Sequence, residues 1–260
     1  MNIRSLLLIS GLWVLSIPLA QAQKGWKAGL IGVPQAVFLY NADDLSLDED
    51  IYRIEPLWGM STGLNLGYNF NDYLGFRVNA LYAQQGGAFS ALRDFENRTT
   101  FVTRLNYVKL PLLLGFNTGP ENRKVMFTMY GGAQLNLLTG ANEYSSYPML
   151  EAPLPDNVSE FPRTTDLYEP LTYSLVGEMG LDIQLPPDNF VLNLRLRADF
   201  SPVDAENKGA TYRVTDNGTT SRVNYWDGVR GGITRRADTY AMSGGLLIGL
   251  TYTFSSAVAP

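Results

Sequence analysis

The chain of 260 residues contains no cysteine and no histidine. Without cysteine, no disulfide can stabilise the fold. Without histidine, the chain lacks the usual general base of hydrolases and the commonest metal ligand, so a Ser–His–Asp triad cannot be assembled. The two absences together leave almost no zinc or haem chemistry. We therefore expect no metal, no cofactor and no enzymatic activity.

Long apolar runs are also missing, apart from one at the N-terminus. MNIRSLLLISGLWVLSIPLAQAQ has one cation, Arg4, then an apolar run from Leu6 to about Ala20 and an Ala-Gln-Ala site. A membrane-spanning helix needs about 20 apolar residues, and this run leads directly to a site that suits signal peptidase. The sequence predicts a secretory signal at 1–22 and a mature domain at 23–260. A retained N-terminal anchor is the alternative.

The net charge of −5 at pH 7 excludes a further class of partner. Removal of the predicted signal takes away one more cation. An acidic chain has no general electrostatic attraction to nucleic acid, so we expect no nucleic-acid partner.

Apolar residues alternate with small or polar ones at a period of two in the rest of the chain. Glycine, β-branched and aromatic residues occur throughout these segments and disfavour helix. The clearest segment, NFVLNLRLRADF, sets Leu192, Leu194 and Leu196 against Asn193 and two arginines. We expect eight such strands, at about 25–40, 57–70, 73–86, 101–117, 124–138, 171–185, 189–200 and 239–254.

Two places in these strands are irregular. Pro34 makes the second half of the first strand ambiguous. Arg104 and Asn106 fall on the apolar parity of the fourth strand, which predicts a bulge or a position beyond the lipid.

The connections between the strands alternate between short and long. Short turns are expected at 71–72, 118–123 and 186–188, and long loops at 41–56, 87–100, 140–170 and 205–238. Short turns at one end, long loops at the other and both termini on the short side are typical of outer-membrane barrels. We predict an all-β fold, an eight-stranded antiparallel up-and-down transmembrane β-barrel in the cell outer membrane.

The composition of the two faces indicates which one points inward. One face carries glycine, serine, threonine, asparagine and a few charges, and the other is large and apolar with aromatic ends. A soluble lipocalin-like barrel or a sandwich would also alternate, but its exterior prefers a coat of lysine and glutamate. We expect the apolar face to contact lipid. The charged residues expected to form a polar network in the lumen are Lys27, Arg77, Lys109, Glu178, Asp182, Arg195, Arg197 and Asp199.

This network has two interpretations, a polar conduit or proton path and an ion-paired plug. Eight strands enclose only enough space for side chains, which favours the plug and argues against open diffusion of solutes. Glu178 and Asp182 are four residues apart on one strand face, which is about 13 Å along a strand and too far for a cooperating acid–base pair.

Two of the long loops carry candidate binding residues. The loop at 41–56, which we call the acidic loop, contains Asp43, Asp44, Asp48, Glu49 and Asp50. It matches no spaced calcium loop, so we interpret it as solvated, with divalent-cation binding as the alternative. The last loop combines arginines and aromatic residues that suit lipopolysaccharide phosphate, a protein partner or interfacial anchoring. These residues are Arg222, Tyr225, Trp226, Arg230, Arg235 and Arg236.

The strand YVKLPLLLGF at 107–116 resembles the PorT-like, porin-family outer-membrane β-barrel proteins of Bacteroidetes, in which a Tyr-x-x-hydrophobic-Pro-Leu-Leu strand recurs. GWKAGLIG and GGLLIGLTYTF resemble the first and last strands of that family. The resemblance implies an eight-stranded barrel inserted by the barrel-assembly machinery, whose recognition signal usually ends in an aromatic residue, here Phe254. Residues 255–260 depart from that pattern.

Some members of that family serve protein secretion or gliding machinery, and no catalytic residues come with the resemblance. We therefore expect a structural or interaction role in the cell envelope, with outer-membrane lipid, lipopolysaccharide and an envelope protein as partners. A narrow porin-like channel for small solutes is the alternative.

Overall fold

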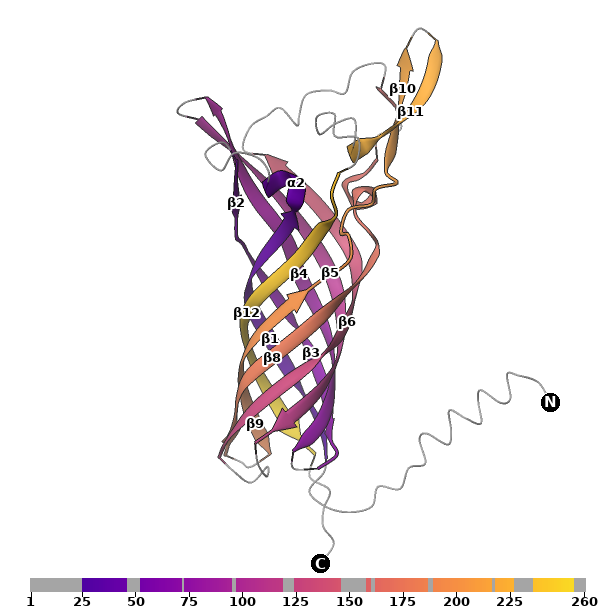
Figure 1. Ribbon diagram of the computed structural model, residues 1–260. Coiled ribbons are helices and arrows are strands. Elements are labelled where there is room, and N and C mark those ends of the chain that lie inside the picture. The colour runs from indigo at the N-terminus through magenta and orange to yellow at the C-terminus, as the bar shows by residue number, and fades with distance from the viewer. Residues whose placement is uncertain are drawn as a thin grey trace, which may run out of the picture.

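The computed structural model describes residues 25–45, 52–71, 73–94, 97–118, 124–145, 158–159, 162–186, 189–216, 218–226 and 236–254. The predicted signal at 1–22 lies outside these ranges. The described chain forms a tall, tilted barrel with further elements at one end (Figure 1). No helix within the described ranges has the length and apolarity that a membrane crossing requires.

Eight antiparallel strands make a closed ring, as predicted. In ring order they are β4 (Leu74–Asp94), β3 (Leu57–Asn69), β1 (Trp26–Asn41), β12 (Thr239–Thr253), β9 (Phe190–Phe200), β8 (Leu171–Leu185), β6 (Val125–Ser145) and β5 (Asn97–Asn117). β5 pairs again with β4, and the first and last strands pair from Lys27 with Thr253 to Asn41 with Thr239. Closure leaves no free sheet edge in the body of the barrel.

The remaining elements lie at the end of the barrel with the long connections, opposite the start of β1 and the end of β12 (Figure 1). They are α2 (Ala42–Leu45), β2 (Tyr52–Glu55), β7 (Val158–Ser159), η2 (Thr164–Leu167), β10 (Thr211–Asp216) and β11 (Thr219–Asn224). We call the described residues of 42–55, 86–106, 139–170 and 202–238 the crown.

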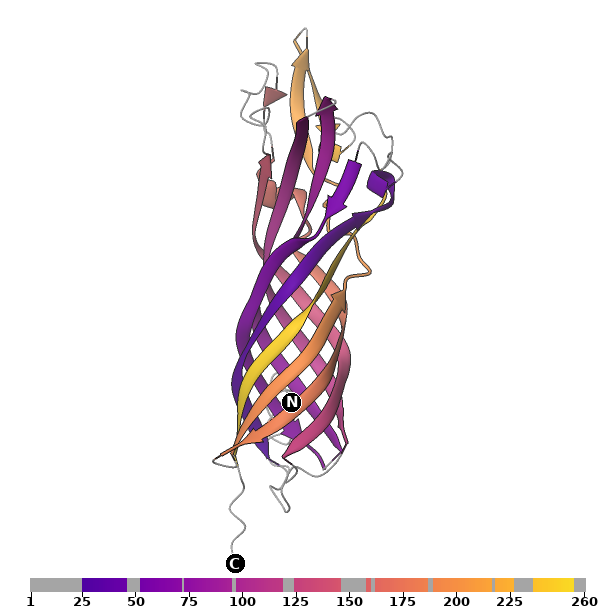
Figure 2. The same ribbon diagram turned by 90° about the vertical axis from the view of Figure 1, so that its left-hand side faces the viewer.

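The prediction of a loop at 87–100 was wrong. β4 runs to Asp94 and β5 starts at Asn97, so these residues form a long hairpin that projects from the barrel (Figure 2). Parts of the predicted loops at 41–56, 140–170 and 205–238 are also regular structure. The cause is that beyond a bilayer both faces of a strand meet water, so the alternation that marks a half-apolar strand is lost while backbone pairing continues.

A bend lies where this hairpin leaves the ring. β4 pairs with β3 up to Ala83 and with β2 from Ala88. Between them, Gly86 has φ +139°, and a Cβ added there would lie 1.9 Å from the Thr103 carbonyl oxygen. A residue with a side chain cannot occupy this position without strain.

The structure also resolves the two irregular places. β1 continues through Pro34, which is exposed and pairs with Met60 of β3, while the pairing of β1 with β12 skips Val33 and Pro34. Proline has no N–H to donate, which explains the gap. The predicted bulge is present on the neighbouring strand, where the register between β5 and β6 shifts and leaves out Thr139.

The outward face of the ring is apolar, and the inward face carries the small and polar residues. Leu30, Leu64 and Leu196 are 65%, 59% and 64% exposed. Toward the lower end in Figure 1, Trp26 packs on Tyr68 with ring centroids 5.2 Å apart, and Phe190 packs on Tyr252 at 5.3 Å. Outward aromatic residues near the strand ends are typical of the girdles that flank an apolar band in a bilayer.

This assignment of faces predicts that Leu194→Arg destabilises the barrel. A cation on the lipid face costs about 2 to 3 kcal/mol near the middle of a bilayer and little near its edges. Unfolding by guanidinium in lipid vesicles would measure the loss. Leu171→Arg, at the outer end of β8, serves as the control and should cost less than about 1 kcal/mol. Equal costs at the two positions would contradict the assignment.

Candidate functional site

The eight charged residues predicted for the lumen all point into the barrel and are at most 6% exposed. They come from β1 (Lys27), β4 (Arg77), β5 (Lys109), β8 (Glu178, Asp182) and β9 (Arg195, Arg197, Asp199). Each occupies an inward position of its strand, since neighbours on the same strand alternate between buried and outward positions. The strand period therefore brings these charges into one interior.

Asp182 is the centre of the first group. Its carboxylate accepts hydrogen bonds from the Arg195 guanidinium and from the Asn193 amide, the latter at 2.9 Å. The Arg77 Nη2 atom donates to the other carboxylate oxygen at 3.4 Å. Lys27 also interacts electrostatically with Asp182. A buried carboxylate requires this number of partners, because it has lost its water.

The Arg197 guanidinium connects the charged residues to a row of uncharged polar side chains. It forms an ion pair with Glu178 and donates to Gln134 Oε1 at 2.5 Å. Gln134 donates in turn to Asn136 at 2.7 Å, and Asn136 donates to Ser174 at 2.8 Å. The network therefore extends across β9, β8 and β6.

A second ion pair lies farther along the lumen. Lys109 Nζ donates to Asp199 Oδ2 at 2.9 Å, and both side chains are 1% exposed. The Gln85 amide donates to the other carboxylate oxygen at 3.2 Å. β5 and β9 are not neighbours in the ring, so this pair bridges the interior.

Tyr130 is a member of the network that charge alone did not reveal. The Arg77 and Arg195 guanidinium carbons lie 4.3 Å and 4.8 Å from the centroid of its ring. Its hydroxyl lies 3.4 Å from Asn117 Oδ1. Two buried cations thus share one aromatic face. The only sign of this role in the sequence is that Tyr130 lies on the inward parity of its strand, which Gln134 and Asn136 share.

An apolar wall faces part of this network. Ile31, Val33, Leu81 and Leu247 form a buried cluster from β1, β4 and β12. Some polar atoms remain without a hydrogen bond among the described residues, namely Arg195 Nη1 and Glu178 Oε2, which are 3.8 Å apart, and atoms of Ser61, Asn65 and Asn79. Side chains fill the lumen, ionic on one side and apolar on the other.

An aromatic cap lies at the crown end of β5. Leu105 and Tyr107 of β5 belong to one buried cluster with Tyr168, Tyr225 and Trp226. The Trp226 indole N–H donates to the backbone oxygen of Asn207 at 2.8 Å, which fixes the ring in place. The sequence predicts a binding or anchoring role for Tyr225 and Trp226, and the structure places both in this cap.

A buried arginine joins two connections of the crown. Arg236 Nε donates to Glu206 at 2.8 Å, and its Nη1 and Nη2 atoms donate to the two oxygens of Asp44 at 2.9 Å and 2.8 Å. Burial alone would lower the pKa of Arg236, but its hydrogen bonds and ion pairs with Asp44 and Glu206 outweigh burial and hold that pKa above its ordinary value. This cation therefore stays charged at every pH at which the protein folds.

The sequence matches the family described as "Outer membrane protein beta-barrel domain" over residues 21–204. The chain belongs to this family. It is accordingly an outer membrane protein. No curated protein sequence matches the chain.

Several solved barrels resemble this outer membrane protein at low identity. OprG from Pseudomonas aeruginosa aligns with a TM-score of 0.41 and 12% identity, covering 90% of this chain and 96% of that one. Neisserial surface protein A aligns with a TM-score of 0.40 and 13% identity, covering 90% of this chain and 100% of that one. The outer membrane protease OmpT from Escherichia coli aligns with a TM-score of 0.41 and 10% identity, covering 92% of this chain and 99% of that one. At these identities the similarity does not extend to function.

The acidic loop of this outer membrane protein has a structural use where the structure describes it. Asp44 binds Arg236, and Asp43 accepts a hydrogen bond from the backbone N–H of Ala237 at 2.6 Å. Within the described ranges, no three potential ligands are grouped to hold a metal. The remaining loop candidates, Asp48, Glu49, Asp50, Arg230 and Arg235, lie outside the described residues, and Arg222 is exposed on β11.

Arg236→Gln is expected to loosen the crown without unfolding the ring. The change removes the charge that holds two carboxylates together, and we expect local opening to become easier by about 2 kcal/mol. Hydrogen–deuterium exchange should rise in α2 and at 204–208, with β8 and β9 unchanged. Arg163→Gln provides the control, because Arg163 is in an exposed ion pair with Asp166. Faster exchange throughout the barrel would contradict a local role.

Proposed function

We propose that this outer membrane barrel is a non-enzymatic structural or interaction component of the cell envelope, belonging to a larger secretion or envelope complex. The observation that carries the proposal is the closed interior. Ion pairs and an apolar wall fill the lumen, and the aromatic cap around Trp226 packs on Leu105 and Tyr107 at the crown end of β5. The crown is then the part of the molecule available to a partner.

The chemistry of the chain supports a role without catalysis. Neither histidine nor cysteine is present, and Glu178 and Asp182 are each bound by arginine in the interior. A carboxylate held in this way is not available to transfer a proton to a substrate. Side chains pack around both carboxylates, so no substrate would reach them.

The partners follow from the same proposal. Outer-membrane lipid and lipopolysaccharide would surround the apolar band, and the barrel-assembly machinery would insert the chain. An envelope protein would contact the crown, and nucleic acid would have no role. We also place the chain in the PorT-like group of Bacteroidetes, and YVKLPLLLGF, which forms the outward leucines and the inward Lys109 of β5, supports this placement.

Site-specific photocrosslinking in native membranes would test the interaction role. A photoreactive residue at Tyr144, which is 55% exposed on the crown part of β6, should give one adduct of defined mass. The same residue at Leu64, which is 59% exposed on the ring, is the control and should give lipid adducts only. The proposal fails if the crown position gives no protein adduct.

A narrow channel is the second candidate, favoured by the buried atoms of Ser61, Asn65 and Asn79 that lack hydrogen-bond partners. These side chains lie on the inward faces of β3 and β4 and suit bound water. We expect purified protein in planar bilayers to show no single-channel steps, because eight strands leave no space for an open pore. Reproducible steps of constant amplitude would favour the channel over the plug.

A further inference from the structure

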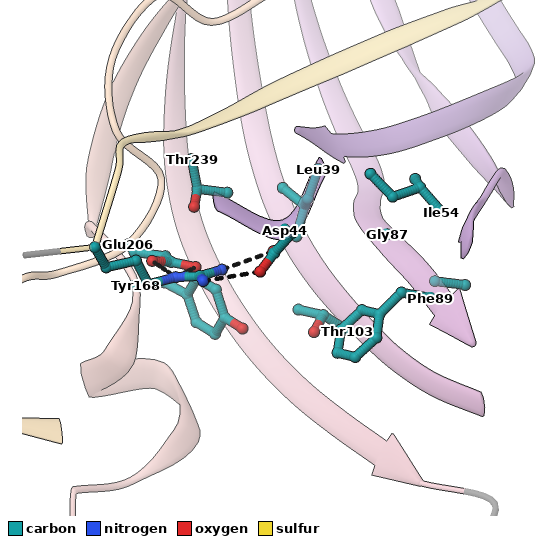
Figure 3. A pocket seen from close by; sticks show the side chains of 11 residues that line it. Leu39, Asp44, Ile54, Gly87, Phe89, Thr103, Tyr168, Glu206 and Thr239 are labelled. Atoms are coloured by element: carbon teal, nitrogen blue, oxygen red, sulfur yellow. Dashed lines mark hydrogen bonds and ion pairs between the residues drawn. The ribbon is translucent and has the colours of Figure 1, made fainter. Parts of the chain in front are cut away.

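A pocket opens in the crown beside the base of the projecting hairpin (Figure 3). It lies where β4 bends away from the ring at Gly86, between the hairpin and the segments that Arg236 joins. Its empty volume is about 440 Å³, the open mouth included. The space that a water-sized group can occupy is about 30 Å³, enough for one ammonium head group, so the stem of a ligand would lie in the open mouth.

One wall of the pocket is apolar although it lies in the crown. Leu39, Ile54, Ala88 and Phe89 contribute to it from β1, β2 and β4. Phe89 is stacked on Phe101 with ring centroids 5.0 Å apart, and both rings remain half-buried. The apolar wall is therefore rigid and accessible, which suits contact with a hydrocarbon group.

The opposite wall carries an excess of negative charge. It contains Asp44, Glu206 and Arg236, and the Asp44 side chain is 21% exposed whereas those of Glu206 and Arg236 are 5% and 3% exposed. Behind this wall, Glu143 accepts a hydrogen bond from the Tyr168 hydroxyl at 2.5 Å. Asp44, Asp204 and Glu206 share two cations, Arg236 and Lys208, which leaves one negative charge, and Asp44 is the group that a ligand would reach.

The hydrogen bonds of Arg236 decide whether that ligand is a cation or an anion. Its Nε, Nη1 and Nη2 atoms all donate to carboxylate oxygens already. An anion entering the pocket would find each guanidinium nitrogen already bound to a carboxylate and two carboxylates that repel it. A cation would meet the partly exposed carboxylate of Asp44 and gain a charge-assisted hydrogen bond.

We propose that this pocket binds a small organic cation, an ammonium or guanidinium group on a short apolar stem. The charged head lies against Asp44, and the stem packs against Ile54 and Phe89. Thr103, whose side chain also lines the pocket, is placed to hydrogen-bond the head group. This site shares no lining residue with the charged network of the lumen and does not depend on the proposed interaction role.

Three probes that share a phenylethyl stem test the sign of the charge. The full barrel, folded in detergent micelles, is titrated with 2-phenylethylamine, with neutral 2-phenylethanol and with anionic 3-phenylpropionate, and binding is followed by NMR shifts of labelled isoleucine methyls. We expect saturable binding of the amine, about five- to tenfold tighter than that of the alcohol. Equal affinity for amine and alcohol, tighter binding of the acid, or no saturation by the amine below about 10 mM would overturn the proposal.

Two variants locate the binding. Ile54→Ser should weaken amine binding at least about fivefold, since it removes apolar contact from the stem. In that variant the shifts of 2-phenylethylamine itself replace the lost methyl probe. Val102→Ser, on the projecting hairpin but not among the residues that line the pocket, is the control and should bind as the natural chain does. Asp44→Asn should abolish the preference for amine over alcohol. If Ile54→Ser and Val102→Ser bind the amine equally, the site is not this pocket.

Discussion

Replacing Asp182 with asparagine is expected to lower the free energy of unfolding by about 3 to 5 kcal/mol. The change keeps the shape of the side chain and removes its charge. Arg77 would then lose its ion-pair partner, and Arg195, which is 1% exposed, would keep only Glu178 at 3.8 Å. A buried cation without a counter-charge costs far more than the net worth of the pair itself, and this sets the size of the effect.

Asp166→Asn is the matched control for this measurement. Asp166 is also paired with an arginine, but the side chains of Arg163 and Asp166 are 83% and 45% exposed. Exposed pairs contribute about 0 to 1 kcal/mol, so this variant should unfold almost as the natural chain does. Denaturant unfolding of both variants in lipid vesicles gives the comparison. Similar losses in the two variants would mean that the lumen charges are hydrated rather than dependent on one another.

Gly180→Ala is the second change for which we expect a large effect, about 3 to 4 kcal/mol. Gly180 points inward on β8, and a Cβ there would lie 2.1 Å from the Leu194 carbonyl oxygen and 2.5 Å from the Arg195 Cα atom. Both of these are backbone atoms, so β8 and β9 would have to separate. The separation would also displace Arg195 from Asp182.

Gly177→Ala, on the same strand, provides the control, because a Cβ there meets nothing within 4 Å. Its cost should stay below about 0.5 kcal/mol, since alanine also limits the unfolded chain more than glycine does. The two variants differ in position along β8 and in the face of the strand on which the added methyl group lies. Equal stability of the two would show that the close approach of β8 and β9 is not required.

The ring was predictable from sequence because a bilayer imposes a simple rule on each strand. One face must be apolar, so Leu192, Leu194 and Leu196 identify β9 and its register without any knowledge of its neighbours. The same parity assigned Lys109 and Asp199 to the interior. The positions of the short turns then gave the antiparallel order.

The crown and the pairing of charges were not predictable in this way. Strands that meet water on both faces do not alternate between apolar and polar residues. The sequence therefore predicts a loop where the structure has the hairpin from Gly87 to Thr100. Which cation meets which carboxylate depends on how the ring closes. Tyr130, which holds two arginines, carries no charge that would reveal its role.

The pairing of Arg77 with Asp182 has a consequence for how this protein reaches its membrane. These residues are 105 positions apart and lie on β4 and β8, which are separated in the ring by β5 and β6. A partly rolled sheet would present both ions to hydrocarbon before they had met. Insertion of one strand at a time is therefore energetically unfavourable. The chain has to form the barrel while these ions are still hydrated and then enter the bilayer as a nearly complete cylinder. Because these contacts join residues far apart in the sequence, formation of the barrel is slow. The newly exported chain therefore needs protection from aggregation before it inserts.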